Sequence, residues 1–160
     1  MAAVFVQNRN CMFKNILFVC VGNICRSPAA EYWARAQLQK SGIDHLNIFS
    51  AGLDAMVGYS IAPEMKTLLD QYQIDASAHQ AQQLTAEHVN QSEIIFVMET
   101  WQKKELLIAF PGGRGKIFCL GQLHDEEVID PYYKGKIVFE SVFKIIQKNW
   151  SAWQEKLWRK

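Results

Sequence analysis

The chain has 160 residues, of which 49% are hydrophobic and 21% charged, and its formal net charge is +1 at pH 7. This composition predicts one globular domain with a sizeable core, and it argues against a nucleic-acid-binding protein or a membrane-inserted one, since no apolar run approaches the roughly 18 residues that span a bilayer. The 4 cysteines are too few for a disulfide scaffold and lack zinc-site spacing, and residues 1–15 lack the apolar segment of a signal peptide, so we expect a reducing, cytoplasmic location.

The first clear element is a strand over residues 16–21, which is continuously apolar and rich in β-branched side chains. Such a run is typical of a strand covered on both faces in a parallel sheet. Ser27 and Pro28 then supply a candidate helix N-cap and a proline suited to the first helical position. A turn between a strand and a helix has free backbone N–H groups, so we predict a phosphate-binding loop after the first strand.

Cys20 and Arg26 enclose this loop, with five residues between them. The loop N–H groups, the positive end of the helix dipole and the Arg26 guanidinium all favour a thiolate at Cys20, which makes Cys20 the predicted nucleophile. The planar fork of Arg26 matches two oxygens of a phosphoryl group, and Ser27 can donate a hydrogen bond to the sulfur. The residues between the two ends would contact the phosphoryl group: Val21, Gly22, Asn23, Ile24 and Cys25. Of these, Gly22 and Asn23 tolerate the left-handed backbone that a sharply curled loop needs.

The rest of the chain alternates between helical and extended patterns. Helices are predicted from Ser27 to about Gly42 and over residues 63–72, 85–90, 101–110 and 138–158, and further strands over residues 46–51, 94–98 and 117–120. Four short strands alternating with helices predict an α/β fold: a single three-layer domain with a four-stranded parallel sheet flanked by helices. Cys119, in the fourth strand, is expected to be a buried and inert thiol.

A second chemical element is the segment Asp130-Pro131-Tyr132-Tyr133. A tyrosyl leaving group departs more easily when it is protonated, and Asp130 is the candidate for this general acid. The same carboxylate could then take a proton from the water that attacks the phosphocysteine. Tyr132 and Tyr133 offer an aromatic wall for a phenyl ring, which would favour phosphotyrosine over the shorter phosphoserine.

The segment Val19–Pro28, VCVGNICRSP, resembles the signature loop of the low-molecular-weight protein tyrosine phosphatases. The resemblance continues through Ser50-Ala51-Gly52-Leu53, the HQAQQL segment from His79 to Leu84, and the DPYY segment, and it covers the chain from about Lys14 to the C-terminal helix. It implies a phosphatase domain over residues 12–160, preceded by a flexible extension at residues 1–11. The segment 50–58 is most similar to bacterial members that act opposite tyrosine autokinases in exopolysaccharide or capsule export.

The same resemblance assigns supporting roles. The loop over residues 52–62 would form one wall of the active-site cleft, with Leu53 among its apolar side chains. His79 would hydrogen-bond the network of Asn23 and Ser27 without touching substrate. Where the family commonly has arginine, this chain has Gln82, which puts in doubt a local charge contact but not the chemistry.

These features predict a metal-free protein tyrosine phosphatase without a cofactor, in which Cys20, Arg26 and Asp130 carry the reaction. Its partners would be a phosphotyrosine protein, with a tyrosine autokinase as the expected substrate, and phosphate or other oxyanions as competitive ligands. An arsenate reductase of the same fold is one alternative, although such enzymes relay electrons through further downstream cysteines and only Cys119 is present here. A non-catalytic phosphotyrosine- or anion-binding module is the other, disfavoured because nucleophile, clamp and acid are all present.

Cys25 lies in the same loop as Cys20, and two interpretations of it stay open. It could fill space under the loop, or its thiol could capture an oxidised Cys20 as a reversible disulfide.

Overall fold

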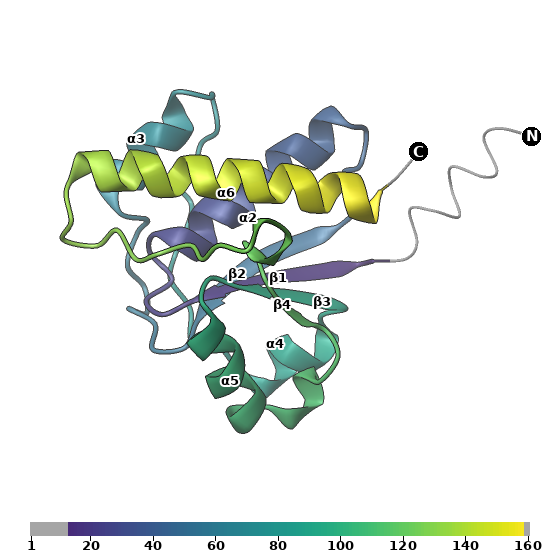
Figure 1. The fold of residues 1–160 in the computed structure, drawn as a ribbon. Coiled ribbons are helices and arrows are strands. Elements are labelled where there is room, and N and C mark those ends of the chain that lie inside the picture. Colours follow the sequence, from purple (N-terminus) through teal and green to yellow (C-terminus); the bar gives the residue numbers. More distant parts are fainter. Residues whose placement is uncertain (1–12, 159–160) are drawn as a thin grey trace, which may run out of the picture.

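A four-stranded sheet forms the middle layer of the computed structural model, which describes residues 13–158. The strands are β1 (Asn15–Cys20), β2 (Asn47–Gly52), β3 (Ile94–Val97) and β4 (Ile117–Cys119). They lie in the order β2-β1-β3-β4, and every neighbouring pair is parallel. The predicted α/β fold is therefore confirmed (Figure 1). The predicted extension at residues 1–11 lies outside the described residues.

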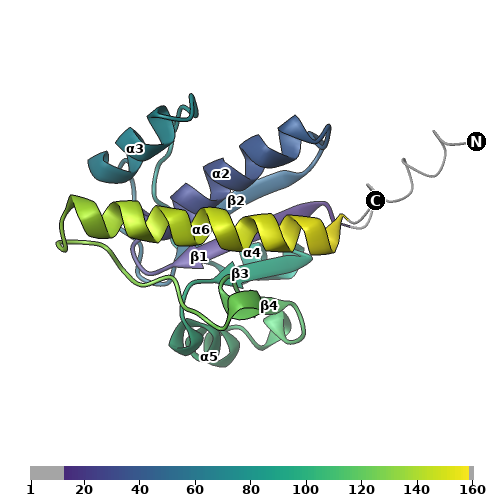
Figure 2. The same cartoon turned by 45° about the horizontal axis from the view of Figure 1, so that its top comes forward.

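Helices cover both faces of the sheet, because successive side chains of a strand point to opposite sides. Ile16 and Phe18 pack into a core under α2 (Arg26–Lys40), α3 (Pro63–Asp70) and α6 (Lys136–Leu157). Leu17 and Val19 pack on the other side, where α4 (Ala86–Gln91) and α5 (Thr100–Ala109) lie. Figures 1 and 2 show these three layers, with α6 running along the outside of the first face.

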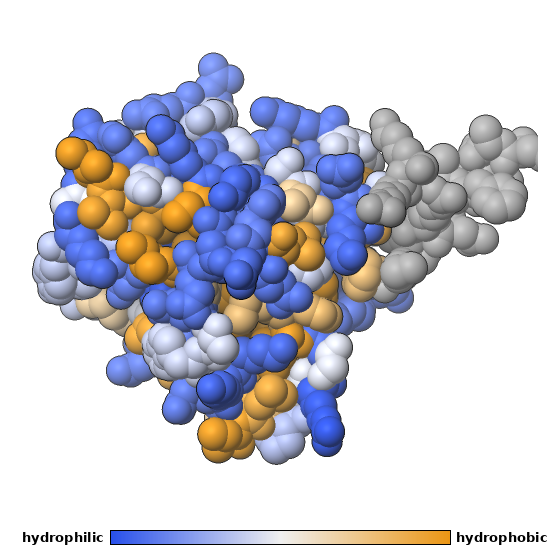
Figure 3. All heavy atoms as spheres, in the orientation of Figure 1, coloured by the Kyte–Doolittle hydropathy of each residue, from blue (hydrophilic) through white to orange (hydrophobic). Residues whose placement is uncertain are grey.

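The long helix α6 closes the larger core. Its Trp150 is fully buried, and the indole contacts Phe18 and Phe96 edge-on, with ring centroids 5.6 and 5.9 Å away. The outer face of α6 is mostly hydrophilic, while apolar side chains gather toward its N-terminal end, where Ile137 is exposed (Figure 3). Among the described residues, no helix combines the length and the apolar character needed to cross a bilayer.

Three local predictions were wrong. The helix after the loop begins at Arg26 with Cys25 as its N-cap, so Ser27 lies in the first turn and its hydroxyl is used by the site instead. The helix predicted to reach residue 72 ends at Asp70, and the chain then turns through Gln73, whose φ is 60°. Cys119 is only partly buried.

The loops after β1 and β2 pack tightly together at the carboxyl ends of the strands. Cys20 pairs with Gly52 in the sheet register, and beyond this pair Leu53 N donates to Cys20 O at 2.9 Å and Asp54 N donates to Val21 O at 3.0 Å. A Cβ at Gly52 would lie 2.4 Å from Val21 O, so only glycine permits this approach. The carboxyl edge of a parallel sheet is where α/β proteins bind their ligands.

Candidate active site

Cys20 is the last residue of the central strand β1, and its side chain is buried beside Ser27. The Sγ atom lies 2.9 Å from the Ser27 Oγ atom. Asn23 Nδ2 donates to the same hydroxyl at 2.8 Å. Because Ser27 Oγ already accepts that bond, its own hydrogen is free to point at the sulfur, where it would stabilise a thiolate. The predicted contact between Ser27 and the sulfur is therefore present.

Asn23 holds the curl of the loop. It is fully buried with φ of 59°, whereas Gly22 has an ordinary φ, so of the two residues expected in the left-handed region only Asn23 occupies it. His79 Nε2 donates to Asn23 O at 2.7 Å, and Gln82 N donates to Asn23 Oδ1 at 2.9 Å. The expected hydrogen bond between His79 and Asn23 is therefore present, and the supporting role of His79 stays a prediction. The Gln82 amide donates to Ser50 O at 2.8 Å, which gives this side chain a neutral structural contact.

The backbone of the loop is arranged as an anion cradle. Its carbonyls point away from the centre: Gly22 O accepts from Met56 N at 3.0 Å, and Ile24 O accepts from Ala62 N at 2.7 Å. Within residues 13–158, the backbone N–H groups of residues 22–25 donate to no protein acceptor. A row of free N–H groups just before the start of α2 is the arrangement that binds phosphate and similar oxyanions.

A buried chain of polar side chains continues from Asn23 toward the surface, and sequence reasoning missed it. Asn23 Nδ2 donates to Ser50 Oγ at 2.9 Å, Ser50 Oγ donates to Glu31 Oε1 at 2.7 Å, and Glu31 pairs with Arg35 at 2.7 Å. Ser50 stood in a recognised motif but carried no assigned role. Nothing in the sequence pattern marked Glu31, which is one polar residue on a helix face.

Arg26 is buried, with 2% of its side chain exposed, and its guanidinium is fixed from two directions. Nη1 donates to Glu99 Oε2 at 2.9 Å and to Val128 O at 3.0 Å. Nη2 lies 3.9 Å from Asp130 Oδ2. Glu99 was not predicted, although its position two residues after the end of β3 places it at the carboxyl edge of the sheet. The pairing neutralises a buried cation and leaves the remaining N–H groups of the fork for another ligand.

Asp130 lies beside Arg26 although it is 104 residues later in the chain, so the structure brings the predicted acid and clamp together. Half of the Asp130 side chain is exposed, and Oδ1 accepts a hydrogen bond from Tyr132 N at 3.0 Å. The Tyr132 and Tyr133 rings are 4.1 Å apart, centroid to centroid. Tyr132 packs against the core, whereas Tyr133 is 90% exposed, so only Tyr132 is anchored as a wall.

Cys25 is buried under the loop as a free thiol. Burial, together with the neighbouring Cys20 and Asp130, raises the pKa of Cys25 from 9.0 to about 12. At neutral pH this thiol is protonated. Its capture of an oxidised Cys20 stays a prediction.

Comparison of the sequence with known protein families identifies the family to which the chain is similar. Residues 15–160 match the family described as low molecular weight phosphotyrosine protein phosphatase. The chain is 39% identical over 142 residues to the probable low molecular weight protein-tyrosine-phosphatase EpsP of Ralstonia solanacearum, a match that covers 89% of this chain and 94% of EpsP.

Solved structures agree in fold. The tyrosine phosphatase AmsI of Erwinia amylovora superposes with a TM-score of 0.86 at 36% identity, covering 92% of this chain and 95% of AmsI. Wzb of Vibrio vulnificus, solved in complex with benzylphosphonate, superposes with a TM-score of 0.83 at 32% identity, covering 90% of this chain and 99% of Wzb.

Proposed function

We propose a mechanism and a substrate for this chain from the premise that it belongs to the low molecular weight phosphotyrosine protein phosphatase family. It is a protein-tyrosine phosphatase, and the proposal concerns which of its residues do the chemistry and on which protein. The observation that carries it is the convergence of Cys20, Arg26 and Asp130 on one cradle of free backbone N–H groups.

In the first step, the Cys20 thiolate attacks phosphorus, the phosphorus–sulfur bond forms, and the bond to the tyrosyl oxygen breaks. Arg26 and the N–H groups of residues 22–25 hold the equatorial oxygens, over which the transition state spreads its charge. Asp130 donates its proton to the departing oxygen, which leaves as a neutral phenol. The partly exposed position of Asp130, beside the clamp, suits a group that must reach a substrate entering from solvent.

In the second step, water attacks the phosphocysteine. Asp130, now ionised, accepts the proton of that water, and the phosphorus–sulfur bond breaks to release inorganic phosphate. The Ser27 hydroxyl stabilises the departing thiolate, while Asn23 and His79 keep the loop in its curled conformation. Substrate-binding contacts are assigned to the loop residues Val21, Gly22, Asn23, Ile24 and Cys25, together with Leu53, Tyr132 and Tyr133.

The proposed substrate is the phosphorylated tyrosine tail of a bacterial autokinase that acts in exopolysaccharide or capsule production, and the proposed location is the cytoplasm. Support comes from the resemblance of residues 50–58 to bacterial family members and from the similarity to EpsP. The benzylphosphonate bound by the Vibrio vulnificus protein supports an aryl-phosphate site with oxyanions as competitive ligands.

The test of the mechanism is Cys20→Ser, assayed on an aryl phosphate and on a phosphotyrosyl peptide. We expect turnover to disappear while phosphate still binds, because a serine hydroxyl stays protonated at neutral pH. Acid quenching of the parent enzyme during turnover should trap phosphate on the peptide that contains Cys20. Cys119→Ser, which changes a partly exposed thiol outside the cradle, is the matched control and should keep its activity.

Retained turnover in Cys20→Ser would refute the proposed nucleophile. The autokinase is tested separately, by comparing kcat/KM on its phosphorylated tail with kcat/KM on a phosphotyrosyl peptide of unrelated sequence. Equal values would remove the autokinase from the proposal and leave the mechanism untouched. Arsenate reduction with a thiol reductant, in an enzyme inert toward phosphotyrosine, would favour the reductase alternative.

A further inference from the structure

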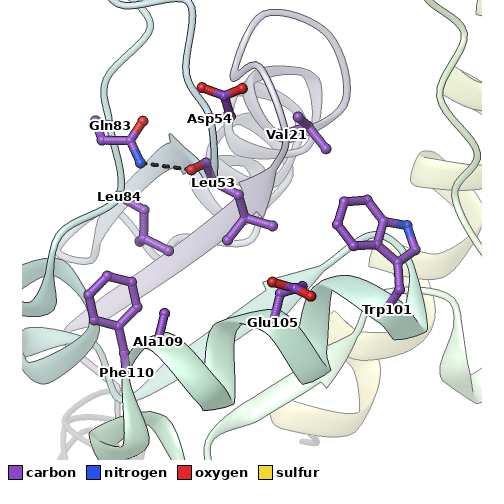
Figure 4. A pocket seen from close by; sticks show the side chains of 9 residues that line it. All are labelled: Val21, Leu53, Asp54, Gln83, Leu84, Trp101, Glu105, Ala109 and Phe110. Atoms are coloured by element: carbon purple, nitrogen blue, oxygen red, sulfur yellow. Dashed lines mark hydrogen bonds between the residues drawn. The ribbon is translucent and has the colours of Figure 1, made fainter.

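A pocket of about 290 Å³ opens next to the cradle, between α5 and the loop after β2. One wall is formed by Asp54 and Gln83, and the other by Trp101 and Glu105 on α5, with Leu53 and Leu84 between them (Figure 4). The mechanism proposed above leaves most of these side chains without a role. We call this feature the α5 groove.

Two lining residues, Val21 and Trp101, link one end of the α5 groove to the reaction centre. Val21, which lines the groove, directly follows Cys20. Trp101 Nε1 donates to Glu99 Oε2 at 3.0 Å, and the same oxygen accepts the bond from Arg26. The groove would therefore begin near the ring of a phosphotyrosine seated on Cys20.

The length of the groove suits a short piece of peptide. Along α5 the lining runs from Trp101 to Phe110, which spans about 14 Å at about 1.5 Å per helical residue. An extended peptide covers that distance in about four residues. The chain on one side of a bound phosphotyrosine would thus lie along the groove.

The groove is preformed and acidic. Both ends of the Gln83 amide are occupied, since its Nε2 donates to Leu53 O at 2.8 Å and its Oε1 accepts from Ala55 N at 2.9 Å, so this wall is held in place. Asp54 and Glu105 line the groove on opposite walls, and none of the nine lining residues is basic. Within the described part of the chain, neither carboxylate forms an ion pair.

Trp101 completes a site for a cation. Trp101 is 47% exposed, and its indole is fixed by the bond to Glu99. Trp101 and Glu105 are four residues apart on α5, which places the ring and the carboxylate on the same helix face. An aromatic face beside a carboxylate binds lysine and arginine side chains through cation–π and ionic contacts together.

We propose that the α5 groove binds the residues that flank the phosphotyrosine, and that Asp54, Glu105 and Trp101 select a lysine or arginine within about four residues of it. This rests on the proposed function and adds a sequence preference to it. The net charge of +1 gives no general attraction for basic peptides, so the preference arises at the groove.

The test uses phosphotyrosyl peptides of identical composition that carry one lysine, moved stepwise through the positions before and after the phosphotyrosine. Their equal charge cancels non-specific attraction. We expect kcat/KM to be about three- to tenfold higher when the lysine lies within reach on one side, and this advantage to shrink as salt is added. For each variant, the measured quantity is the ratio of kcat/KM on its best peptide to kcat/KM on its worst peptide.

The Asp54→Asn and Glu105→Gln double variant should lose this ratio, and Glu105→Lys should shift the preference to a glutamate at the same position. Glu155→Gln, an exposed glutamate on α6, is the matched control and should keep the ratio. A parent enzyme with no positional preference, or a preference that survives in the double variant, would overturn the inference. Hydrolysis of free phosphotyrosine, which has no flanking residues, separates the two proposals. An enzyme that fails to hydrolyse it would contradict the proposed function itself, whereas an enzyme that hydrolyses it but shows no positional preference would contradict only the inference about the groove.

Discussion

Asp130 differs from Cys20 and Arg26, the other two residues proposed to carry the reaction, in how the protein holds it. Cys20 and Arg26 are each 2% exposed, while half of the Asp130 side chain is open to solvent. Its one short hydrogen bond comes from Tyr132 N, and the Arg26 contact is long at 3.9 Å. A carboxylate held this loosely can follow a leaving group outward and then return toward an attacking water.

Replacement of Asp130 by alanine should therefore slow poor leaving groups far more than good ones, because only poor leaving groups need the proton. We expect losses on the order of 10² to 10⁴ in kcat/KM for phenyl phosphate, and a much smaller loss for a dinitrophenyl phosphate. Rates across a series of aryl phosphates measure this. Asp44→Ala, in an exposed loop, is the control. An equal loss across the series would mean that Asp130 is not the acid.

Cys25 makes stability depend on pH in the alkaline range. Since the folded protein raises the pKa of Cys25 from 9.0 to about 12, it retains a proton that the unfolded chain loses above pH 9. The free energy of unfolding should therefore fall as pH rises from about 9 toward 12, by on the order of 1 kcal/mol at pH 10 from this thiol alone. Serine does not ionise there, so Cys25→Ser should lack this component. Urea unfolding of both proteins at pH 7 and pH 10 tests it, and an equal pH-dependent loss in both would contradict the assignment.

Single residues also show where sequence reasoning stops. Cys20, Arg26 and Asp130 could be predicted because each belongs to a short motif whose chemistry is readable on its own. Glu99 could not, because its partner Arg26 is 73 residues away and nothing local marks a glutamate that will pair with a buried guanidinium. Ser27 was correctly linked to the sulfur but wrongly made an N-cap, since the helix begins one residue earlier, at Arg26, and Ser27 lies within its first turn.

Among the elements, the joined loops after β1 and β2 depend on one glycine. Gly52→Ala should destabilise the protein by about 1–3 kcal/mol, because its Cβ would lie 2.4 Å from Val21 O and 3.0 Å from the Ala55 Cβ. Gly22→Ala is the matched comparison within the same pair of loops, as its Cβ would find nothing nearer than 3.7 Å. Thermal unfolding should therefore show a clear loss of Tm for Gly52→Ala and little change for Gly22→Ala. The reverse order would mean that the contact between the loops is not the constraint.

The types and order of the elements could be predicted because they depend on local patterns. Continuous apolar runs predicted the four strands, and three- and four-residue spacings predicted the helices, with errors of one or two residues at most ends. The ends themselves depend on tertiary contacts. The helix expected to include Tyr72 stops at Asp70, and the Tyr72 ring packs instead against Trp33 and Phe143, at 5.0 and 5.9 Å.

For the molecule as a whole, the strand order explains why so distant segments share one site. β1 lies between β2 and β3, so its carboxyl end is flanked by the loops that follow both neighbours. The loop after β2 supports the backbone of the cradle, the segment after β3 supplies Glu99, and the segment after β4 supplies Val128 and Asp130. A parallel sheet alone predicts that the site lies at the carboxyl edge of the strands, but it does not predict which side chains meet there.

The bond between the Arg26 guanidinium and Val128 also bears on local unfolding of the segment that contains Val128. Val128 belongs to no helix or strand, yet its carbonyl binds Arg26 and its N–H donates to Met98 O at 3.0 Å. If this segment opened alone, a buried cation would lose a partner, which makes such local fluctuations costly. The Val128 amide should thus exchange with deuterium nearly as slowly as the amides of β3, while the neighbouring Ile129 amide exchanges quickly. Rapid exchange at Val128, followed by NMR, would show that the segment detaches independently of the sheet.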